Sequence, residues 1–236
     1  GEGDDTYHIT GYSDTAWELP NQGHDTVQTI VSFTLGENFE DLVLDGSADI
    51  LGYGNQVSNI ITGNSGNNEL GGAGGDDRLL GADGNDRLDG GAGNDVLDGG
   101  NGNDTATYIG ALSGVTVDLG QSGPQDTGGG GFDTLIGIEN LFGSWQNDQL
   151  TGDSGANSIE GFVGDDVITG GLGADTLTGG NGVDIFRDTA AGLNGDTIVD
   201  FTTADKIIIV DANIQNFQYS LAGKVFTVTR GSLSLG

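Results

Sequence analysis

The nonapeptide Gly90-Gly91-Ala92-Gly93-Asn94-Asp95-Val96-Leu97-Asp98 decides the fold, because its pattern recurs along the chain with a constant period. Units of nine residues fill residues 54–107 six times and residues 143–187 five times. Every unit has Gly at the first place, Asp or Asn at the sixth and, except for Ala106, a large apolar residue at the eighth. Such a period indicates a repeat architecture in which each unit packs on its neighbours.

Each place in the unit has its own physical task. Glycine in the first six places permits positive φ and lets successive turns approach closely. The last three residues, such as 96–98, form a short strand. Its middle side chain points to one face, and the side chains before and after it point to the other face. We expect the stacked eighth-place residues to form a thin core. We also expect two units to make one full coil, so that the same edge returns every eighteen residues.

This coil predicts which acidic side chains meet along each edge. The expected stacks are Asp77 above Asp95 and Asp86 above Asp104 in the first block, then Asp148, Asp166 and Asp184 along one edge of the second block with Asn157 and Asp175 along the other. Carboxylates stacked a few ångströms apart repel one another unless a cation lies between them.

Composition points to the same kind of partner. The 236 residues include 47 Gly and 29 Asp, and only six Lys and Arg, for a net charge of −30. Such a surface repels phosphate backbones and anionic lipids, which excludes nucleic-acid binding and membrane insertion. The absence of Cys excludes disulfides, zinc–thiolate sites and thiol nucleophiles. The composition therefore favours a cation as the partner.

The unit at residues 90–98 resembles the glycine-rich calcium-binding nonapeptide of the RTX (repeats-in-toxin) family, and residues 170–175 and 179–184 match that nonapeptide equally well. The resemblance implies an all-β fold, a right-handed parallel β-roll (a β-solenoid) with several Ca²⁺ ions in its turns. Calcium accepts 6–8 oxygen ligands from carboxylates and carbonyls together. The implied ligands are the sixth-place side chains of Asp77, Asp86, Asp95, Asp104, Asp148, Asp166, Asp175 and Asp184, and the second- and fourth-place carbonyls of Gly84, Gly91, Gly93, Gly100, Gly102, Gly164, Gly171, Gly173, Gly180 and Gly182.

Several units depart from the family pattern. Asn59, Asn68 and Asn157 each replace the sixth-place carboxylate with an amide, so we expect weak or empty sites there. The unit that begins at Gly72 keeps its Asp but alters the glycine pattern, and the unit at residues 143–148 lacks the inner glycines. Because one buried apolar residue per unit is small against the entropy of ordering nine residues, we expect calcium binding to supply folding free energy. The chain is then largely disordered without Ca²⁺.

The period divides the chain into segments. We expect the tail of a preceding repeat plus a β lead-in at 1–53, the first RTX block at 54–107, a β insertion and lead-in at 108–142, the second block at 143–187 and a C-terminal β flank or cap at 188–236. Residues 1–7 resemble the end of another unit, which indicates a piece of a longer array. No segment predicts a helix. Trp17 and Trp145 are interpreted as packing residues.

The resemblance implies a calcium-binding module that folds outside the cell and stabilises or assists the secretion of a larger protein. Its expected partners are calcium and the type I secretion machinery, and its expected location is outside a Gram-negative bacterium or on its surface. The alternative is a module that binds polysaccharide, as repeat modules of alginate epimerases do, or an adhesin or surface-lattice module that contacts neighbouring copies. Neither His8 nor His24 belongs to a catalytic motif, so these residues predict no enzyme, although the larger protein could be an extracellular one.

Overall fold

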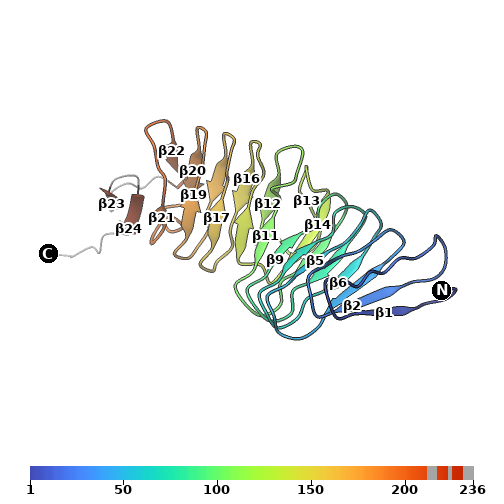
Figure 1. The fold of residues 1–236 in the computed structure, drawn as a ribbon. Helices are drawn as coiled ribbons and strands as arrows, with labels where there is room; N and C mark the ends of the chain where they lie inside the picture. Colours follow the sequence, from blue (N-terminus) through green and yellow to red (C-terminus); the bar gives the residue numbers. More distant parts are fainter. Residues whose placement is uncertain (212–216, 223–224, 231–236) are drawn as a thin grey trace. The chain divides into compact units, whose positions relative to one another are not determined.

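The computed structural model describes residues 1–211, 217–222 and 225–230 (Figure 1). The described residues form short strands joined by turns, and they include no helix, as predicted. None of them forms a helical segment long and apolar enough to cross a membrane. The chain makes two compact units: Gly1–Tyr108 with Ser122–Ile138, and Ile109–Gln121 with the described residues from Glu139 onward.

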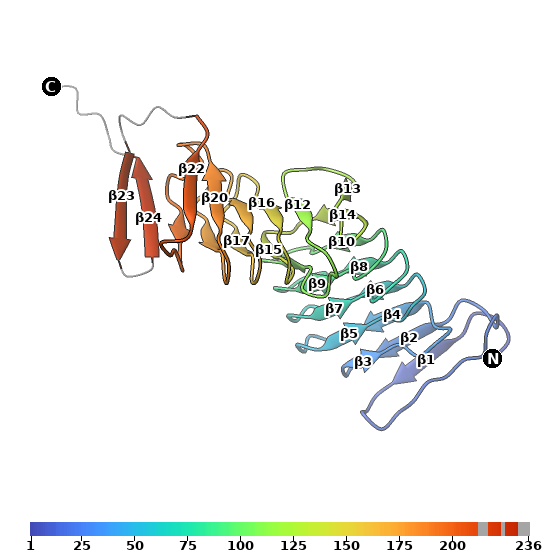
Figure 2. The ribbon, with the colours of Figure 1, turned by 90° about the horizontal axis from the view of Figure 1, so that it is seen from above.

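The first unit has two rows of strands, which are seen beside one another in Figure 2. The first row runs in the order β1 (Thr6–Ile9), β2 (Thr26–Thr29), β4 (Asp41–Leu44), β6 (Ile60–Thr62), β8 (Arg78–Leu80), β10 (Val96–Asp98), β14 (Phe132–Ile136) and β13 (Gln125–Asp126). The second row runs in the order β3 (Phe33–Thr34), β5 (Leu51–Tyr53), β7 (Glu69–Gly71), β9 (Arg87–Asp89) and β11 (Thr105–Thr107). All pairs are parallel except β13 with β14.

The second unit repeats this plan (Figure 1). One row holds β12 (Thr116–Asp118), β16 (Gln149–Thr151), β18 (Val167–Thr169), β20 (Ile185–Asp188) and β22 (Lys206–Ile209), all parallel. The other row holds β15 (Asn140–Phe142), β17 (Ser158–Glu160), β19 (Thr176–Thr178) and β21 (Thr197–Ile198), followed by the antiparallel strands β24 (Val225–Arg230) and β23 (Phe217–Ala222). Lys224, which the sequence places in a strand, lies outside the described residues.

The register confirms the eighteen-residue coil. Leu79 of β8 pairs with Leu97 of β10, and Ile159 of β17 pairs with Leu177 of β19. From β2 to β11 and again from β15 to β22, strands that follow one another in the chain alternate between the two rows of a unit, so each pair of nonapeptides completes one coil. The fold is therefore a β-solenoid of the roll type.

Within the two repeat blocks, the core consists of the eighth-place side chains. Each three-residue strand buries its middle residue and leaves its neighbours partly or fully exposed in most units, as the two-residue period of a strand requires. The eighth-place residues are at most 1% exposed: Ile61, Leu70, Leu79, Leu88, Leu97, Ala106, Leu150, Ile159, Ile168, Leu177 and Phe186. With one such residue per unit the apolar interior is thin, so other interactions must hold the turns.

Two findings differ from the sequence analysis. The segment at residues 108–142 is divided: β12 pairs with β16 in the second unit, whereas β14 pairs with β10 in the first. The interpretation of Trp17 and Trp145 as packing residues is wrong, because their exposed fractions are 72% and 56%. Trp145 covers only part of its ring by stacking on Phe162, with the two ring centroids 6.5 Å apart.

Candidate metal sites in the turns

The sixth-place side chains stack along the edges of the coils as predicted. Each side chain uses one oxygen to accept a hydrogen bond from the backbone N–H of the residue one coil earlier. These bonds are Asp77 N to Asp95 Oδ1 (2.8 Å), Asp86 N to Asp104 Oδ1 (2.7 Å), Asp148 N to Asp166 Oδ1 (2.9 Å), Asp166 N to Asp184 Oδ1 (3.1 Å) and Asn157 N to Asp175 Oδ1 (2.9 Å). One oxygen of each carboxylate is thus committed to holding neighbouring coils together.

The second oxygen of these carboxylates is different. Oδ2 is buried and has no hydrogen-bond partner in Asp77, Asp86, Asp95, Asp166 and Asp175. Burial without a partner penalises the charged form. It raises the pKa of Asp77 and Asp86 to about 6 and that of Asp95 and Asp166 to about 7. These buried carboxylate oxygens recur from coil to coil without hydrogen-bond donors. A cation bound between them would stabilise this arrangement.

The surroundings of each Oδ2 are rich in oxygen. A Cβ placed on Gly72 would overlap Asp77 Oδ2 and would lie 2.5 Å from the carbonyl oxygen of Gly90 in the next coil. A Cβ on Gly161 would likewise overlap Asp166 Oδ2 and lie 2.8 Å from a carbonyl oxygen of the next coil. The first-place glycine therefore keeps open a space bordered by a carboxylate and a carbonyl oxygen. Calcium, which binds both kinds of oxygen, fits this donor set.

The second and fourth places give these turns their backbone conformation. We call a turn with positive φ at both places an open turn. The predicted second-place glycines have φ between 87° and 96°: Gly91, Gly100, Gly171 and Gly180. The predicted fourth-place glycines also have positive φ: Gly84, Gly93, Gly102, Gly164, Gly173 and Gly182. Ala73, Ala82 and Phe162 take positive φ at the second place although they carry a Cβ. Because this conformation is costly for them, the stack must impose it.

Seven units have open turns, and the other four have a second geometry that we call the closed turn. Closed turns lie at residues 54–59, 63–68, 143–148 and 152–157 and have no positive φ. In each, the second-place N–H donates to the sixth-place side chain: Asn55 to Asn59 (2.8 Å), Asn64 to Asn68 (2.7 Å), Ser144 to Asp148 (2.6 Å) and Asp153 to Asn157 (2.9 Å). The second-place side chain then accepts the fourth-place N–H. These turns satisfy their own polar groups.

In the three units with Asn at the sixth place, the side-chain amide donates to nearby oxygen atoms. It therefore does for these oxygens what a bound cation would do. Asn59 Nδ2 donates to the carbonyls of Phe39 (3.0 Å) and Glu40 (3.1 Å). Asn157 Nδ2 donates to the Glu139 carbonyl at 2.8 Å. An amide that donates to these oxygens has no need of a metal, so weak or empty sites stay the prediction for these units.

Asp148 is the one predicted ligand whose surroundings are those of a closed turn. Its Oδ1 accepts from Val115 N (2.8 Å) and Ser144 Oγ (2.7 Å), and its Oδ2 accepts from Ser144 N (2.6 Å). Ser144 stands at the second place, where open turns carry a residue with positive φ. Both oxygens thus have donors, so the geometry offers no reason to assign a cation to Asp148.

The ladders continue through residues that the nine-residue period did not reveal. Asp95 N donates to Asp133 Oδ1, Asp175 N to Asp196 Oδ1 and Asp184 N to Asp205 Oδ1, each at 3.0 Å. Two of the three begin an Asp-Thr-aliphatic triplet, Asp133-Thr134-Leu135 and Asp196-Thr197-Ile198, as Asp175-Thr176-Leu177 does inside the repeats. A search for that triplet, independent of spacing, finds them.

Comparisons with known proteins identify the repeats to which these turns belong. The family model of the RTX calcium-binding nonapeptide repeat matches the chain in four copies, at residues 53–86, 71–106, 142–177 and 160–187. A stretch of 61 residues, 26% of this chain, is 44% identical to endo-1,3-1,4-beta-glycanase EglC of Rhizobium meliloti (strain 1021). A stretch of 63 residues, 27% of the chain, is 41% identical to endo-1,3-1,4-beta-glycanase ExsH of the same organism. Each match spans 13% of the relative's length.

Proposed function

We propose that this chain, which contains RTX calcium-binding nonapeptide repeats, is a module that folds when it binds Ca²⁺ outside the cell and thereby stabilises and assists the secretion of a larger type I secreted protein. The observation that carries the proposal is the series of buried Oδ2 atoms without hydrogen-bond partners in the open turns. Each of these atoms costs free energy in the metal-free fold and becomes a favourable ligand when a cation is bound.

The proposed calcium ligands are the sixth-place carboxylates of the open turns, with carbonyl oxygens of the stacked turns completing each site. The ligand set comprises Asp77, Asp86, Asp95, Asp104, Asp166, Asp175 and Asp184 with the predicted second- and fourth-place glycine carbonyls. Bound calcium would neutralise charge between neighbouring coils. Asp148 is left out because its oxygens are already donor-satisfied.

Electrostatics supports folding that depends on calcium concentration. The chain carries a net charge of −30, and its stacked carboxylates are buried, so self-repulsion and desolvation both oppose the metal-free roll. A structural site that does not exist in the unfolded chain turns binding free energy into folding free energy. A module of this kind stays extended where calcium is scarce, as inside a cell, and folds where calcium is abundant.

The relatives support a role as part of a larger protein. The stretches similar to this chain make up 13% of two proteins named as glycanases, so in them such a stretch accompanies a much longer polypeptide. We propose the same setting here, with an extracellular protein as the passenger. The polysaccharide-binding alternative gains no support: Arg78 lies in β8 and Arg87 in β9, on different rows, so they form no shared basic groove for an anionic glycan.

The test is a calcium titration followed by far-UV circular dichroism at neutral pH. We expect a disordered spectrum in excess chelator and a cooperative change to a β spectrum in the millimolar range of Ca²⁺, with magnesium at the same concentration as the control. A full β spectrum in chelator would contradict calcium-dependent folding. A calcium-dependent fold that leaves export of a fused passenger unchanged would contradict the secretion role alone.

A further inference from the structure

A hollow of about 550 Å³ lies on the second unit, where the turns after β15, β17 and β19 are stacked. Its lining includes Trp145, Glu160, Phe162, Thr178, Asn181 and Asp200. Glu160 and Thr178 end neighbouring strands and pair in register, and Asn181 forms a bridge with Val163 of the preceding coil. The hollow therefore spans consecutive coils. None of the sixth-place aspartates lines it in the described part of the chain.

One wall of the hollow is aromatic. Trp145 stacks on Phe162 with an angle of 19° between the two ring planes. Phe142 packs edge-on against the same Phe162 ring, with the ring centroids 5.4 Å apart. Trp145 nevertheless remains more than half exposed. An indole ring that is held by a neighbouring ring and still faces solvent is a surface on which a flat ligand can stack.

Phe162 takes its place in this wall at a conformational cost. Its φ is 72°, in the left-handed region that Gly91 and Gly171 occupy at the same place of their units. A residue with a Cβ pays for this conformation, and the large side chain of Phe is an uncommon choice there. Backbone strain of this kind is found at ligand-binding sites. The strain is thus consistent with a role for the aromatic side chain that glycine could not supply.

The hollow is also acidic. Asp200 is fixed to the turn by two backbone groups, because Gly179 N donates to its Oδ1 at 3.0 Å and Gly180 N donates to its Oδ2 at 2.7 Å. Glu160 is partly buried, and this burial together with the negative charge of Asp200 raises the pKa of Glu160. Among the described residues, no basic side chain lines the hollow. Two carboxylates therefore share this space without a countercharge from its walls.

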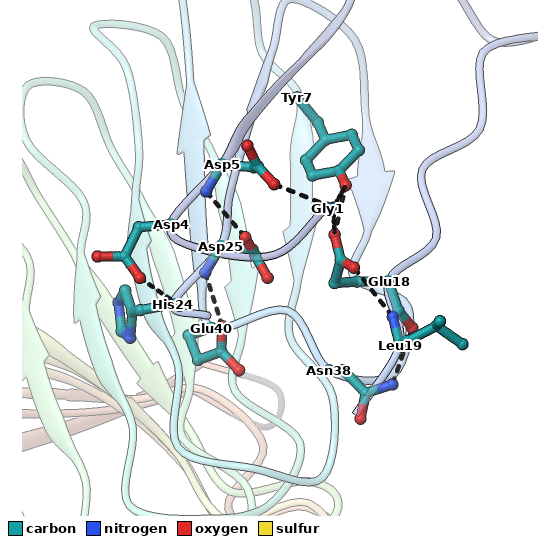
Figure 3. Close-up of polar contacts among 10 residues, drawn as sticks. All are labelled: Gly1, Asp4, Asp5, Tyr7, Glu18, Leu19, His24, Asp25, Asn38 and Glu40. Carbon is teal, nitrogen blue, oxygen red and sulfur yellow. Dashed lines mark hydrogen bonds and ion pairs between the residues drawn. The ribbon is translucent and has the colours of Figure 1, made fainter. Parts of the chain in front are cut away.

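The Glu160 carboxylate differs from a buried glutamate elsewhere in the molecule. Glu18 of the first unit is satisfied on both oxygens, because Leu19 N donates to its Oε1 at 3.0 Å and the Tyr7 hydroxyl donates to its Oε2 (Figure 3). No residue that the structure describes donates a hydrogen bond to the Glu160 carboxylate. Glu160 therefore keeps both oxygens available to a ligand that enters the hollow.

We propose that this hollow binds the guanidinium group of an arginine side chain on a partner polypeptide, with the guanidinium stacked on Trp145 and paired with Glu160. A guanidinium is flat, stacks on aromatic rings and donates two parallel hydrogen bonds to one carboxylate. Aromatic rings beside carboxylates attract such a cation, and the net charge of −30 favours basic partners.

The size of the hollow favours a polypeptide over a small cation. Its volume is in the range of sites that hold ligands much larger than one guanidinium, so it leaves room for the backbone on either side of the arginine. Free arginine carries its own carboxylate, which Glu160 and Asp200 would repel. This binding site goes beyond the proposed function, because calcium-dependent folding requires neither Trp145 nor Glu160.

The experiment follows the fluorescence of Trp145 in millimolar Ca²⁺. Trp17, the other of the two tryptophans, is replaced by Phe so that Trp145 alone reports. The probe is a Gly-Arg-Gly tripeptide with uncharged ends, and the control probe carries citrulline, which keeps the shape of arginine without its charge. Glu160→Gln is compared with Glu37→Gln, which removes the same charge from an exposed side chain of the first unit. Circular dichroism in calcium confirms that each variant retains its β spectrum.

We expect the arginine peptide to change the Trp145 emission in a saturable way and the citrulline peptide to leave it unchanged. Glu160→Gln should raise the half-saturating concentration of the arginine peptide by roughly tenfold, because a charge-assisted pair of hydrogen bonds is lost. Glu37→Gln should leave that concentration unchanged. Free arginine should bind more weakly than the blocked peptide.

Equal responses to the two peptides, or equal half-saturating concentrations in the two variants, would overturn the site. A response to a neutral glucan oligosaccharide without one to the arginine peptide would assign the hollow to sugars and overturn it as well. Free arginine that binds as tightly as the blocked peptide would overturn the assignment to a polypeptide. Should Glu160→Gln fail to fold, calorimetric titration of Trp145→Ala against Trp17→Ala decides the matter, with binding lost only in Trp145→Ala.

Discussion

Asp77 donates its backbone N–H to Asp95 Oδ1 at 2.8 Å, while Oδ2 of the same Asp95 side chain is buried with no hydrogen-bond partner. One side chain therefore does two things: its first oxygen joins adjacent coils, and its second is available to a cation. The closed turns show the alternative, in which the second-place backbone N–H donates to the sixth-place side chain, joined at Asp148 by the hydroxyl of Ser144.

Asp166 and Asp148 occupy the same place of consecutive coils but have different surroundings. Asp166→Asn keeps an acceptor for Asp148 N and removes the unpaired oxygen, so we expect one bound calcium ion fewer and a calcium affinity of the second block weaker by on the order of tenfold. Asp148→Asn is the matched control and should leave the number of bound ions unchanged. Isothermal titration calorimetry measures both. An equal loss of ions in the two variants would contradict the distinction between open and closed turns.

A closed turn should become an open one by two substitutions. Asn64 supplies the side chain that locks the turn, and Asn68 supplies the amide that fills it. Asn64→Gly together with Asn68→Asp restores the glycine and the carboxylate of an open turn, so we expect one additional calcium ion per chain. Asn68→Asp alone should destabilise the calcium-free form by about 1–3 kcal/mol, because it buries a carboxylate beside Asn64 Oδ1. Equilibrium dialysis of the double variant showing no extra ion would refute this account.

Stacking of the turns makes certain glycines irreplaceable for steric as well as conformational reasons. A Cβ on Gly93 would overlap the carbonyl oxygen of Gly75, whereas Gly123, also at positive φ, has nothing within 4 Å of such an atom. Gly93→Ala should therefore lower the free energy of unfolding in calcium by roughly 2 kcal/mol more than Gly123→Ala, which carries only the conformational cost. Urea unfolding at saturating calcium gives the comparison. Equal losses would mean that the coils can move apart.

The sequence predicted the repeating part of this fold in detail and the rest only in outline. A period of nine residues with Leu97 and its equivalents facing inward is enough to place every repeat strand, its register and the stack of Asp77 on Asp95. The same period predicts nothing where the spacing between ladder residues changes. Asp133 lies 38 residues after Asp95, and Asp196 lies 21 after Asp175, yet both continue the ladders. Position in space depends there on loop lengths that the pattern does not encode.

The residue types of the candidate metal sites could be predicted from the sequence. Which carboxylates keep an oxygen without hydrogen-bond donors could not. The missing inner glycines set the unit of Asp148 apart from that of Asp166, but only the structure shows that Ser144 donates to both oxygens of Asp148. Hydrogen-bond donors around an oxygen, rather than the identity of the acidic residue, decide which carboxylates remain open to a metal.

Acid should partly replace calcium in folding the chain. Burial raises the pKa of Asp77 and Asp86 to about 6 and that of Asp95, Asp166 and Asp196 to about 7, against an ordinary value of 3.8. Between these values the calcium-free folded chain binds more protons than the unfolded chain, so its stability falls as pH rises and is greatest below about pH 4. In chelator, we expect the β signal in circular dichroism to increase when the pH falls from about 7.5 to about 4.5.

The dependence of folding on pH should change sign when calcium is present. It should weaken when the buried carboxylates that titrate are removed. Protons compete with Ca²⁺ for the same oxygens, so the calcium concentration at the folding midpoint should rise as pH falls through about 7 to 6. Asp95→Asn with Asp166→Asn should flatten the response in chelator, because the amides do not titrate, whereas Glu37→Gln on the surface should not. A β signal in chelator that grows with rising pH would show that the buried carboxylates are ionised at no cost, and the need for a metal between the coils would disappear with it.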